Sequence, residues 1–170
     1  MNHSSTHLHG VFAPVLTPFA SNLAPDPDRF AKHCRWLVDQ DVGLAIFGTN
    51  SEAASLSVDE KLDLLHQLIE RGIPPQKLMP GTGSCSLTES IAMTKPAVAA
   101  GCAGVLMLPP FYYKGVSDDG LFRSFSTIID TVGDARLKIY LYHIPQVSQV
   151  PISLDLIARL LKRYPTVIAG

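Results

Sequence analysis

The chain has 170 residues, of which 46% are hydrophobic and 17% charged, and its formal net charge is −1 at pH 7. This composition predicts a folded core and excludes a disordered chain, and the length favours one domain. The near-neutral charge predicts no nucleic-acid partner and no binding to an anionic membrane, and no apolar run approaches the roughly 20 residues that span a bilayer.

The chain begins with a polar stretch, residues 1–9, which we predict to be a flexible leader. It lacks the apolar segment of a signal peptide, and its three histidines have no nearby cysteine or carboxylate, so it predicts no metal site. The three cysteines, Cys34, Cys85 and Cys102, are an odd number at spacings that match no zinc or redox motif. They favour a cytoplasmic protein whose thiols are reduced and buried.

Six short apolar runs, several of them rich in β-branched residues, predict strands that are buried on both faces. The runs begin about 30 residues apart, which is the size of a β-α-β unit. They cover residues 10–16, 43–47, 77–80, 104–108, 137–142 and 166–169.

The five segments between these runs carry helix signals. Asp26 followed by Pro27 predicts the start of the first helix, and Ser117 and Ser153 predict the caps of the last two. Pro96 predicts a kink in the third helix. A hydroxyl and a carboxylate three residues apart predict capping boxes at two starts: Ser57 with Glu60, and Ser86 with Glu89. Apolar spacing predicts the buried faces of the first two helices: Phe30, Cys34, Leu37 and Val38, then Val58, Leu62, Leu65 and Ile69.

This alternation predicts an α/β fold with a parallel sheet covered by helices, for which two architectures compete. An open doubly wound sheet would be complete in this length, whereas a (β/α)₈ barrel needs roughly 250 residues. No Gly-x-Gly-x-x-Gly motif follows the first run, which argues against a dinucleotide-binding sheet. The segment 81–84 (Gly-Thr-Gly-Ser) lacks the lysine of a phosphate-binding loop and predicts a tight turn.

Polar residues follow several runs, at the end of the strands where barrel active sites form. Residues 48–52 (Gly-Thr-Asn-Ser-Glu) offer amides and hydroxyls for a carboxylate, or form an ordinary Ser/Asn turn. Period-two alternation places Tyr142 on the same strand face as Tyr140, with Tyr142 nearer the rim. His143 faces the other way and is expected to be structural, and Tyr112 is expected to pack.

Four segments, in order and in register, resemble the dihydrodipicolinate synthase / N-acetylneuraminate lyase family of class I pyruvate-dependent aldolases. They are residues 10–19 (GVFAPVLTPF), 48–52 (GTNSE), 109–113 (PPFYY) and 142–145 (YHIP), and the closing TVIAG resembles the strand that leads into the family's lysine. The resemblance implies a (β/α)₈ TIM barrel, of which residues 10–170 form the N-terminal part of a single domain, roughly its first five and a half units. It also implies a homotetramer built from tight dimers.

The resemblance further implies an enzyme that joins or cleaves a C–C bond between pyruvate, or another 2-oxo acid, and an aldehyde, through a lysine Schiff base and without a cofactor. Tyr142 and Thr49 match the family's proton relay, and Tyr113 matches the tyrosine that completes a neighbour's site across the tight dimer. Thr49, Asn50 and Ser51 match the carboxylate pocket, although the family usually has Gly-Thr-Thr-Gly-Glu there.

Two further features concern specificity and completeness. Val147 stands where the synthases carry an arginine that binds the second substrate's carboxylate, and a valine cannot form that pair. The resemblance implies that the Schiff-base lysine lies just beyond Gly170, and the seven lysines of this chain fall in other elements. A barrel cut there would expose strand edges, so we expect the chain to be a fragment and inactive alone.

We therefore predict a lyase or aldolase of the hydroxy-oxo-acid type. One alternative is a dihydrodipicolinate synthase. Another is a non-catalytic truncated relative that acts as a binding or assembly partner through its dimer face. A third is a complete doubly wound domain of unrelated function.

Overall fold

The computed structural model describes Leu8 and residues 10–169. The rest of the predicted leader, with its three histidines, and Gly170 lie outside the described residues. The elements in chain order are β1 (Phe12–Pro14), α1 (Pro27–Asp39), β2 (Gly43–Ala45), the 3-10 turns η1 (Thr49–Ser51) and η2 (Ala53–Ser55), α2 (Val58–Glu70), η3 (Pro75–Lys77), α3 (Leu87–Ala99), β3 (Val105–Met107), α4 (Asp118–Val132), β4 (Ile139–Leu141), α5 (Pro145–Ser148), α6 (Leu154–Arg163) and β5 (Ile168–Ala169).

The strands pair in parallel and in chain order. β1 pairs with β2, and β4 lies between β3 and β5. Residues 78–81 join the two groups, since the amide of Met79 donates to the carbonyl of Leu44 at 2.8 Å and that of Leu106 donates to the carbonyl of Pro80 at 3.0 Å. The predicted third strand is thus formed only as isolated parallel bridges at Leu78 and Gly81, because Pro80 has no N–H to extend the ladder.

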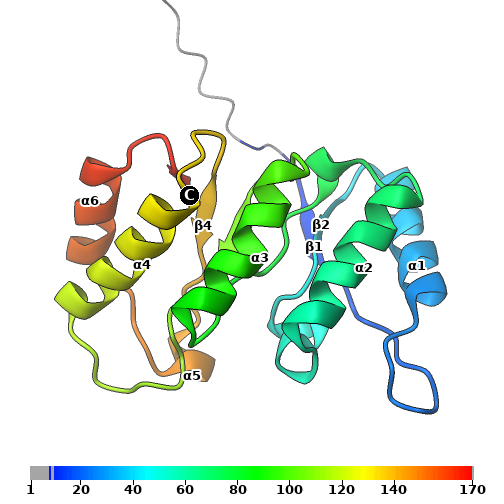
Figure 1. Cartoon of the computed structure of the whole chain (residues 1–170), viewed down its shortest axis with the longest axis horizontal. Helices are drawn as coiled ribbons and strands as arrows, with labels where there is room; N and C mark the ends of the chain where they lie inside the picture. The colour runs from blue at the N-terminus through cyan, green and yellow to red at the C-terminus, as the bar shows by residue number, and fades with distance from the viewer. Residues whose placement is uncertain (1–7, 9, 170) are drawn as a thin grey trace, which may run out of the picture.

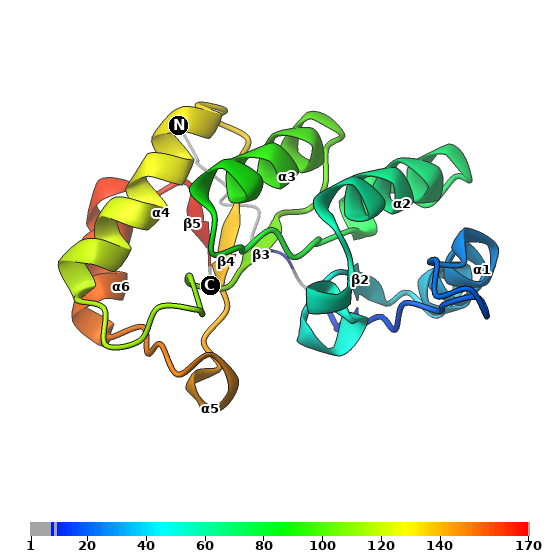
Figure 2. The ribbon, with the colours of Figure 1, turned by 60° about the horizontal axis from the view of Figure 1, so that its bottom comes forward.

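The five longer helices cover the same side of this sheet. α1, α2, α3, α4 and α6 stand in a row in Figure 1, each in contact with the next, and Figure 2 shows the strands along the inner side of that row. A doubly wound sheet would reverse its strand order and carry helices on both faces. The observed order and layering therefore exclude that alternative and leave the barrel arrangement.

Helix starts follow the local signals closely. Asp26, Ser57, Ser117 and Ser153 cap their helices as predicted, and Ser57 with Glu60 forms the complete capping box. The second predicted capping box is only half formed. Ser86 accepts the amide of Glu89 at 3.3 Å, but the Glu89 carboxylate accepts a hydrogen bond from Ser84 Oγ at 2.6 Å instead of reaching back to Ser86. α3 continues through Pro96 to Ala99, and the predicted kink there stays a prediction.

The buried helix faces are predicted in part. Of the expected α1 face, Phe30 and Cys34 are buried, while Leu37 and Val38 are half-buried. α2 turns a different part of its surface inward, because its apolar positions cover too much of the circumference for periodicity to fix the deepest ones. Its buried residues are Leu64, Leu65 and Leu68, and the predicted Val58, Leu62 and Ile69 are only half-buried.

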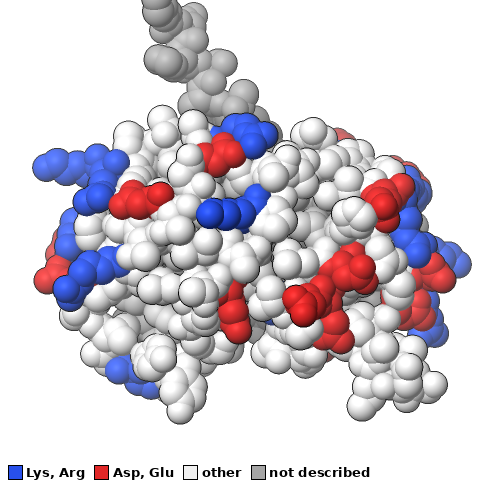
Figure 3. Space-filling view, in the orientation of Figure 1, with Lys and Arg blue, Asp and Glu red and all other residues white. Residues whose placement is uncertain are grey.

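The surface of the helical face carries both signs of charge, and much of it is uncharged (Figure 3). Among the described residues, no helix is both long enough and apolar enough to cross a membrane.

Cys34 is buried as predicted, whereas Cys85 and Cys102 are only partly buried, so the expectation of three buried thiols is wrong for two of them.

Candidate functional site

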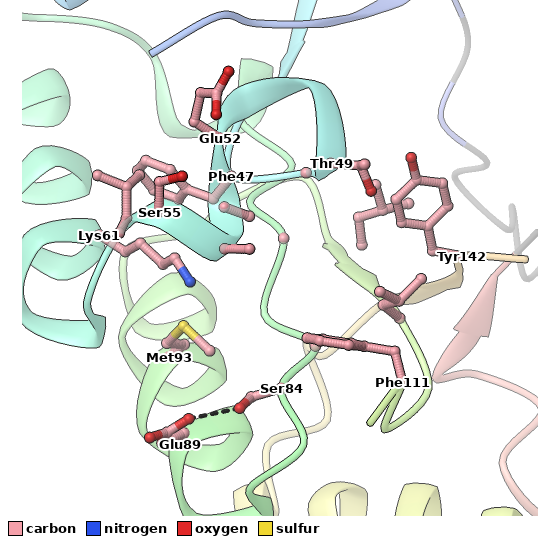
Figure 4. A pocket seen from close by; sticks show the side chains of 18 of the residues that line it. Phe47, Thr49, Glu52, Ser55, Lys61, Ser84, Glu89, Met93, Phe111 and Tyr142 are labelled. Carbon is pink, nitrogen blue, oxygen red and sulfur yellow. Dashed lines mark hydrogen bonds between the residues drawn. The ribbon is translucent and has the colours of Figure 1, made fainter. Parts of the chain in front are cut away.

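A pocket of about 460 Å³ lies at the carboxyl ends of the strands (Figure 4). Its walls come from the loops that follow β2, residues 78–81, β3 and β4, together with the inward sides of α2 and α3. The C-terminal end of the strands is where barrel folds place their active sites. This pocket is therefore the candidate functional site.

Two glycines allow the loops around the pocket to approach one another. A Cβ atom on Gly81 would lie 2.0 Å from the carbonyl oxygen of Phe47, and one on Gly83 would lie 2.4 Å from the amide nitrogen of Leu108. Phe47 itself is buried with a left-handed φ of 57°, which turns the chain out of β2 into the pocket wall. The prediction of a tight turn at 81–84 is wrong, because Gly81 continues the parallel pairing and the segment makes close backbone contacts that only glycine permits.

The segment after β2 was expected to bind a carboxylate through Thr49, Asn50 and Ser51. Only Thr49 lines the pocket; the exposed Asn50 is not part of the lining. Ser51 is fully buried, and its hydroxyl donates to the carbonyl of Ala45 at 3.3 Å, while its own carbonyl accepts from Thr17 Oγ1 at 2.7 Å. Ser51 supports the loop from beneath, so a direct part in substrate binding does not fit this structure.

Tyr142 extends the pairing of β3 and β4, because its amide donates to the carbonyl of Met107 at 2.9 Å. This bond holds the start of its loop at the rim, and the tyrosine ring forms part of the pocket wall. Figure 4 shows Tyr142 and Thr49 on the same side of the pocket. The structure therefore brings together the two residues that the resemblance assigns to a proton relay.

The neighbours of Tyr142 have structural roles. The ring of Tyr140 packs over Gly104, where a Cβ atom would come within 2.7 Å of it, and burial raises the pKa of Tyr140. His143 is exposed, and its Nδ1 accepts a hydrogen bond from the amide of Ile152 at 3.1 Å. This bond ties the loop after β4 together and agrees with the structural role predicted for His143.

Tyr113 does not join Thr49 and Tyr142 within this chain. It lies outside the pocket lining and is 54% exposed, on the loop after β3. Tyr112 is 75% exposed and packs against Tyr113, since the two rings meet edge to face with centroids 5.4 Å apart. Phe111 is the aromatic residue of this loop that lines the pocket.

Three charged residues line the pocket, and the sequence analysis named only Glu52, as part of the segment 48–52; it missed Lys61 and Glu89. Lys61 on α2 reaches the wall opposite Tyr142, and Glu89 on α3 lies on the same side of the pocket, beyond Met93 (Figure 4). Burial lowers the pKa of Lys61, and the charge of Glu89 opposes this shift. Lys61 lies in a helix, as expected, but its long side chain brings the amine into the pocket.

Val147 lines the pocket and is 62% exposed, on α5 just beyond the rim. It leaves an apolar surface at the position where the resemblance places an arginine.

Within residues 10–169 and Leu8, no three His, Cys, Asp or Glu side chains come together in a way that could hold a metal ion.

Comparison with known proteins gives consistent matches along the chain. The sequence pattern of the Dihydrodipicolinate synthetase family matches residues 7–169. An uncharacterized DapA-like lyase from Chloroflexus aurantiacus is 35% identical over 164 residues, which cover 95% of this chain and 54% of the relative. The crystal structure of dihydrodipicolinate synthase from Agrobacterium tumefaciens superposes with a TM-score of 0.90 at 32% identity, over 94% of this chain and 56% of that one.

A second solved structure contains a bound small molecule. The chloride-inhibited dihydrodipicolinate synthase from Acinetobacter baumannii, complexed with pyruvate, matches with a TM-score of 0.78 at 28% identity, over 90% of this chain and 52% of that one. The chain thus spans about half the length of the relatives it matches. With six parallel strand positions and the helices between them, it has the predicted fold, the first five and a half units of a (β/α)₈ barrel.

Proposed function

The chain belongs to the dihydrodipicolinate synthetase family, and from this premise we propose that the protein is a Schiff-base aldolase or lyase that acts on pyruvate and an aldehyde. The observation that carries the proposal is the pocket at the carboxyl ends of the strands, which Thr49 and Tyr142 line on the same side. A relative with pyruvate bound supports pyruvate as the 2-oxo acid.

In this proposal a neutral lysine amine attacks the keto carbon of pyruvate, and water leaves to give an iminium ion that accepts electrons during C–C bond formation or cleavage. Tyr142 and Thr49 relay the protons that these steps require. The pyruvate carboxylate binds beside Thr49, next to the turn that Ser51 supports.

The attacking lysine is proposed to lie just beyond Gly170. The pairing of β4 with β5 supports this position, because Tyr140 lies opposite Ala169. Continuing the same register past Gly170 brings the next residues alongside Tyr142, at the rim of the pocket. A lysine there would meet the keto carbon on the same side as the proposed proton relay.

The second substrate is proposed to be a hydroxyaldehyde rather than a carboxylated semialdehyde. Val147 supports this assignment, since an apolar side chain cannot pair with a carboxylate. The alternative, dihydrodipicolinate synthesis, is supported by the similarity to synthases such as the Agrobacterium tumefaciens protein. A non-catalytic relative remains the third candidate, and the labelling experiment below separates it from both enzymes.

The assembly and location of the protein are also proposals. The exposed Tyr112–Tyr113 pair suits an arm that reaches a second protomer in a tight dimer, and such dimers would pair into a tetramer. Residues 10–170 are proposed to belong to a single barrel domain, and the free thiols suit a cytoplasmic protein.

Reductive trapping tests the proposed chemistry. The full-length protein and the polypeptide ending at Gly170 are each incubated with pyruvate and borohydride, and intact masses are measured with and without pyruvate. We expect one reduced pyruvate adduct on the full-length protein and none on the shorter polypeptide. An unlabelled full-length protein would refute the Schiff-base function. An adduct mapped to Lys61 would instead move the reactive amine to the α2 wall.

A further inference from the structure

The segment from Phe111 to Lys114 is tied to the loops on both sides of it. On one side, the amide of Tyr112 donates to Cys85 Sγ at 3.2 Å, in the loop that precedes α3. On the other side, the Lys114 ammonium donates to the carbonyl of Ser148 at 2.8 Å and also to the carbonyl of Phe111. Lys114 therefore joins two loops that are 34 residues apart in sequence.

The acceptor on α5 is held in place by its own side chain. Ser148 is buried, and its hydroxyl bonds to the carbonyls of Ile144 and Val150 at 3.1 and 3.3 Å. Gln149, the residue after it, has a left-handed φ of 53° that ends the helix. A carbonyl at the end of a helix has no intrahelical partner, and a lysine ammonium is a favourable donor to it.

The two segments joined by Lys114 both contribute to the mouth of the pocket. Phe111 and Val147 line it, and Lys114 binds the carbonyl of Phe111 itself and of Ser148, the residue next to Val147. The side of the pocket near Thr49 and Tyr142 is held by hydrogen bonds that do not involve Lys114. Thr17 donates to the carbonyl of Ser51, and the Tyr142 amide donates to the carbonyl of Met107.

We propose that Lys114 is a positioning residue that fixes the distance between Phe111 and Val147 and thereby sets recognition of the aldehyde, without a part in pyruvate capture. The inference rests on the proposed function for its catalytic readout. The structural part of the inference does not depend on that function: Lys114 holds the two loops together through the carbonyls of Phe111 and Ser148, and we call this contact the clamp.

The test uses the full-length protein with Lys114→Met, which removes the donor, and Lys114→Arg, which restores it. Lys95→Met, an exposed position on α3, is the matched control. The readouts are the rate of pyruvate trapping by borohydride, the KM for the aldehyde, and hydrogen exchange of residues 109–117 and 144–150. The aldehyde is the one that the unmutated enzyme condenses fastest with pyruvate among glyceraldehyde, glycolaldehyde and succinic semialdehyde.

We expect Lys114→Met to trap pyruvate at the unmutated rate. The KM for the aldehyde should rise roughly tenfold to a hundredfold, because a charge-assisted hydrogen bond is removed. Both segments should also lose protection against hydrogen exchange. Lys114→Arg should recover most of the KM, and Lys95→Met should change nothing. Unchanged exchange in either segment, or an equal fall in pyruvate trapping and aldehyde use, would overturn the inference. If the unmutated protein fails to trap pyruvate, the proposed function fails, and hydrogen exchange alone decides the clamp.

Discussion

Replacing Gly81 by alanine tests whether the close backbone contact builds the pocket. The new Cβ would lie 2.0 Å from the carbonyl oxygen of Phe47, where ordinary contacts begin at 3.4 Å. Neither the new Cβ nor the carbonyl oxygen is the end of a flexible side chain, so the clash can be relieved only by a shift of the backbone at the carboxyl end of β2. Overpacking of this kind costs about 1–3 kcal/mol, and we expect the upper end because both atoms belong to fixed backbone.

The matched control is Gly101→Ala. Gly101 has a φ of +80°, and a Cβ atom there meets nothing within 4 Å, so only the left-handed conformation is penalised, by about 1 kcal/mol. The free energy of unfolding is measured by urea titration of the full-length variants, with pyruvate trapping as the readout of pocket geometry. We expect Gly81→Ala to be the less stable variant and to trap pyruvate more slowly. If Gly81→Ala is no more destabilised than Gly101→Ala and traps normally, the close contact does not shape the site.

Three further predictions follow from the pocket and from buried groups. Tyr142→Phe should lower kcat of the full-length enzyme by about 10²–10⁴-fold, because it removes a positioned proton donor, and near-native turnover would refute the relay. Condensation of pyruvate with aspartate semialdehyde should be poor and should improve in Val147→Arg, since a charge-assisted hydrogen bond to the carboxylate is worth about 1.5–3 kcal/mol and valine cannot form it. Burial raises the pKa of Cys34 and Cys102 to about 12, so both remain neutral thiols at pH 8. Mass spectrometry after brief alkylation of the folded protein at that pH should find both unmodified; modification of either before Cys85 would contradict their raised pKa.

The helices and their caps were predictable because their signals are local. Ser57 and Glu60 satisfy each other's backbone groups within one turn, and no distant part of the fold intervenes. The second capping box fails for a reason that is equally local. Ser84, five residues before Glu89, donates to the Glu89 carboxylate, and its hydroxyl oxygen accepts the Ser86 amide that the box would have satisfied. The short helix α5 was missed because four residues that begin with Pro145 carry no helical period.

The site was only partly predictable, because side-chain direction depends on contacts between distant segments. Thr49 and Ser51 are two residues apart on one turn, yet one lines the pocket and the other lies buried against Ala45. Lys61 was missed since a long side chain on a helix can reach a wall that its backbone does not form. Tyr142 was placed correctly because strand alternation fixes its face and the strand end fixes its depth.

The distribution of charge around the pocket bears on which aldehyde the proposed enzyme would take. Among the described residues that line the pocket, Lys61 is the only cation, and it stands on the wall opposite Tyr142, with Glu89 on the same side of the pocket. The α5 side presents Val147, and the cation next to it, Lys114, donates to two backbone carbonyls. A carboxylate held beside α5 would therefore need a cation that this wall does not offer, whereas a neutral hydroxyaldehyde needs only hydrogen-bonding groups and an apolar surface. This wall therefore supports the proposed hydroxy-oxo-acid reaction over the alternative synthase reaction.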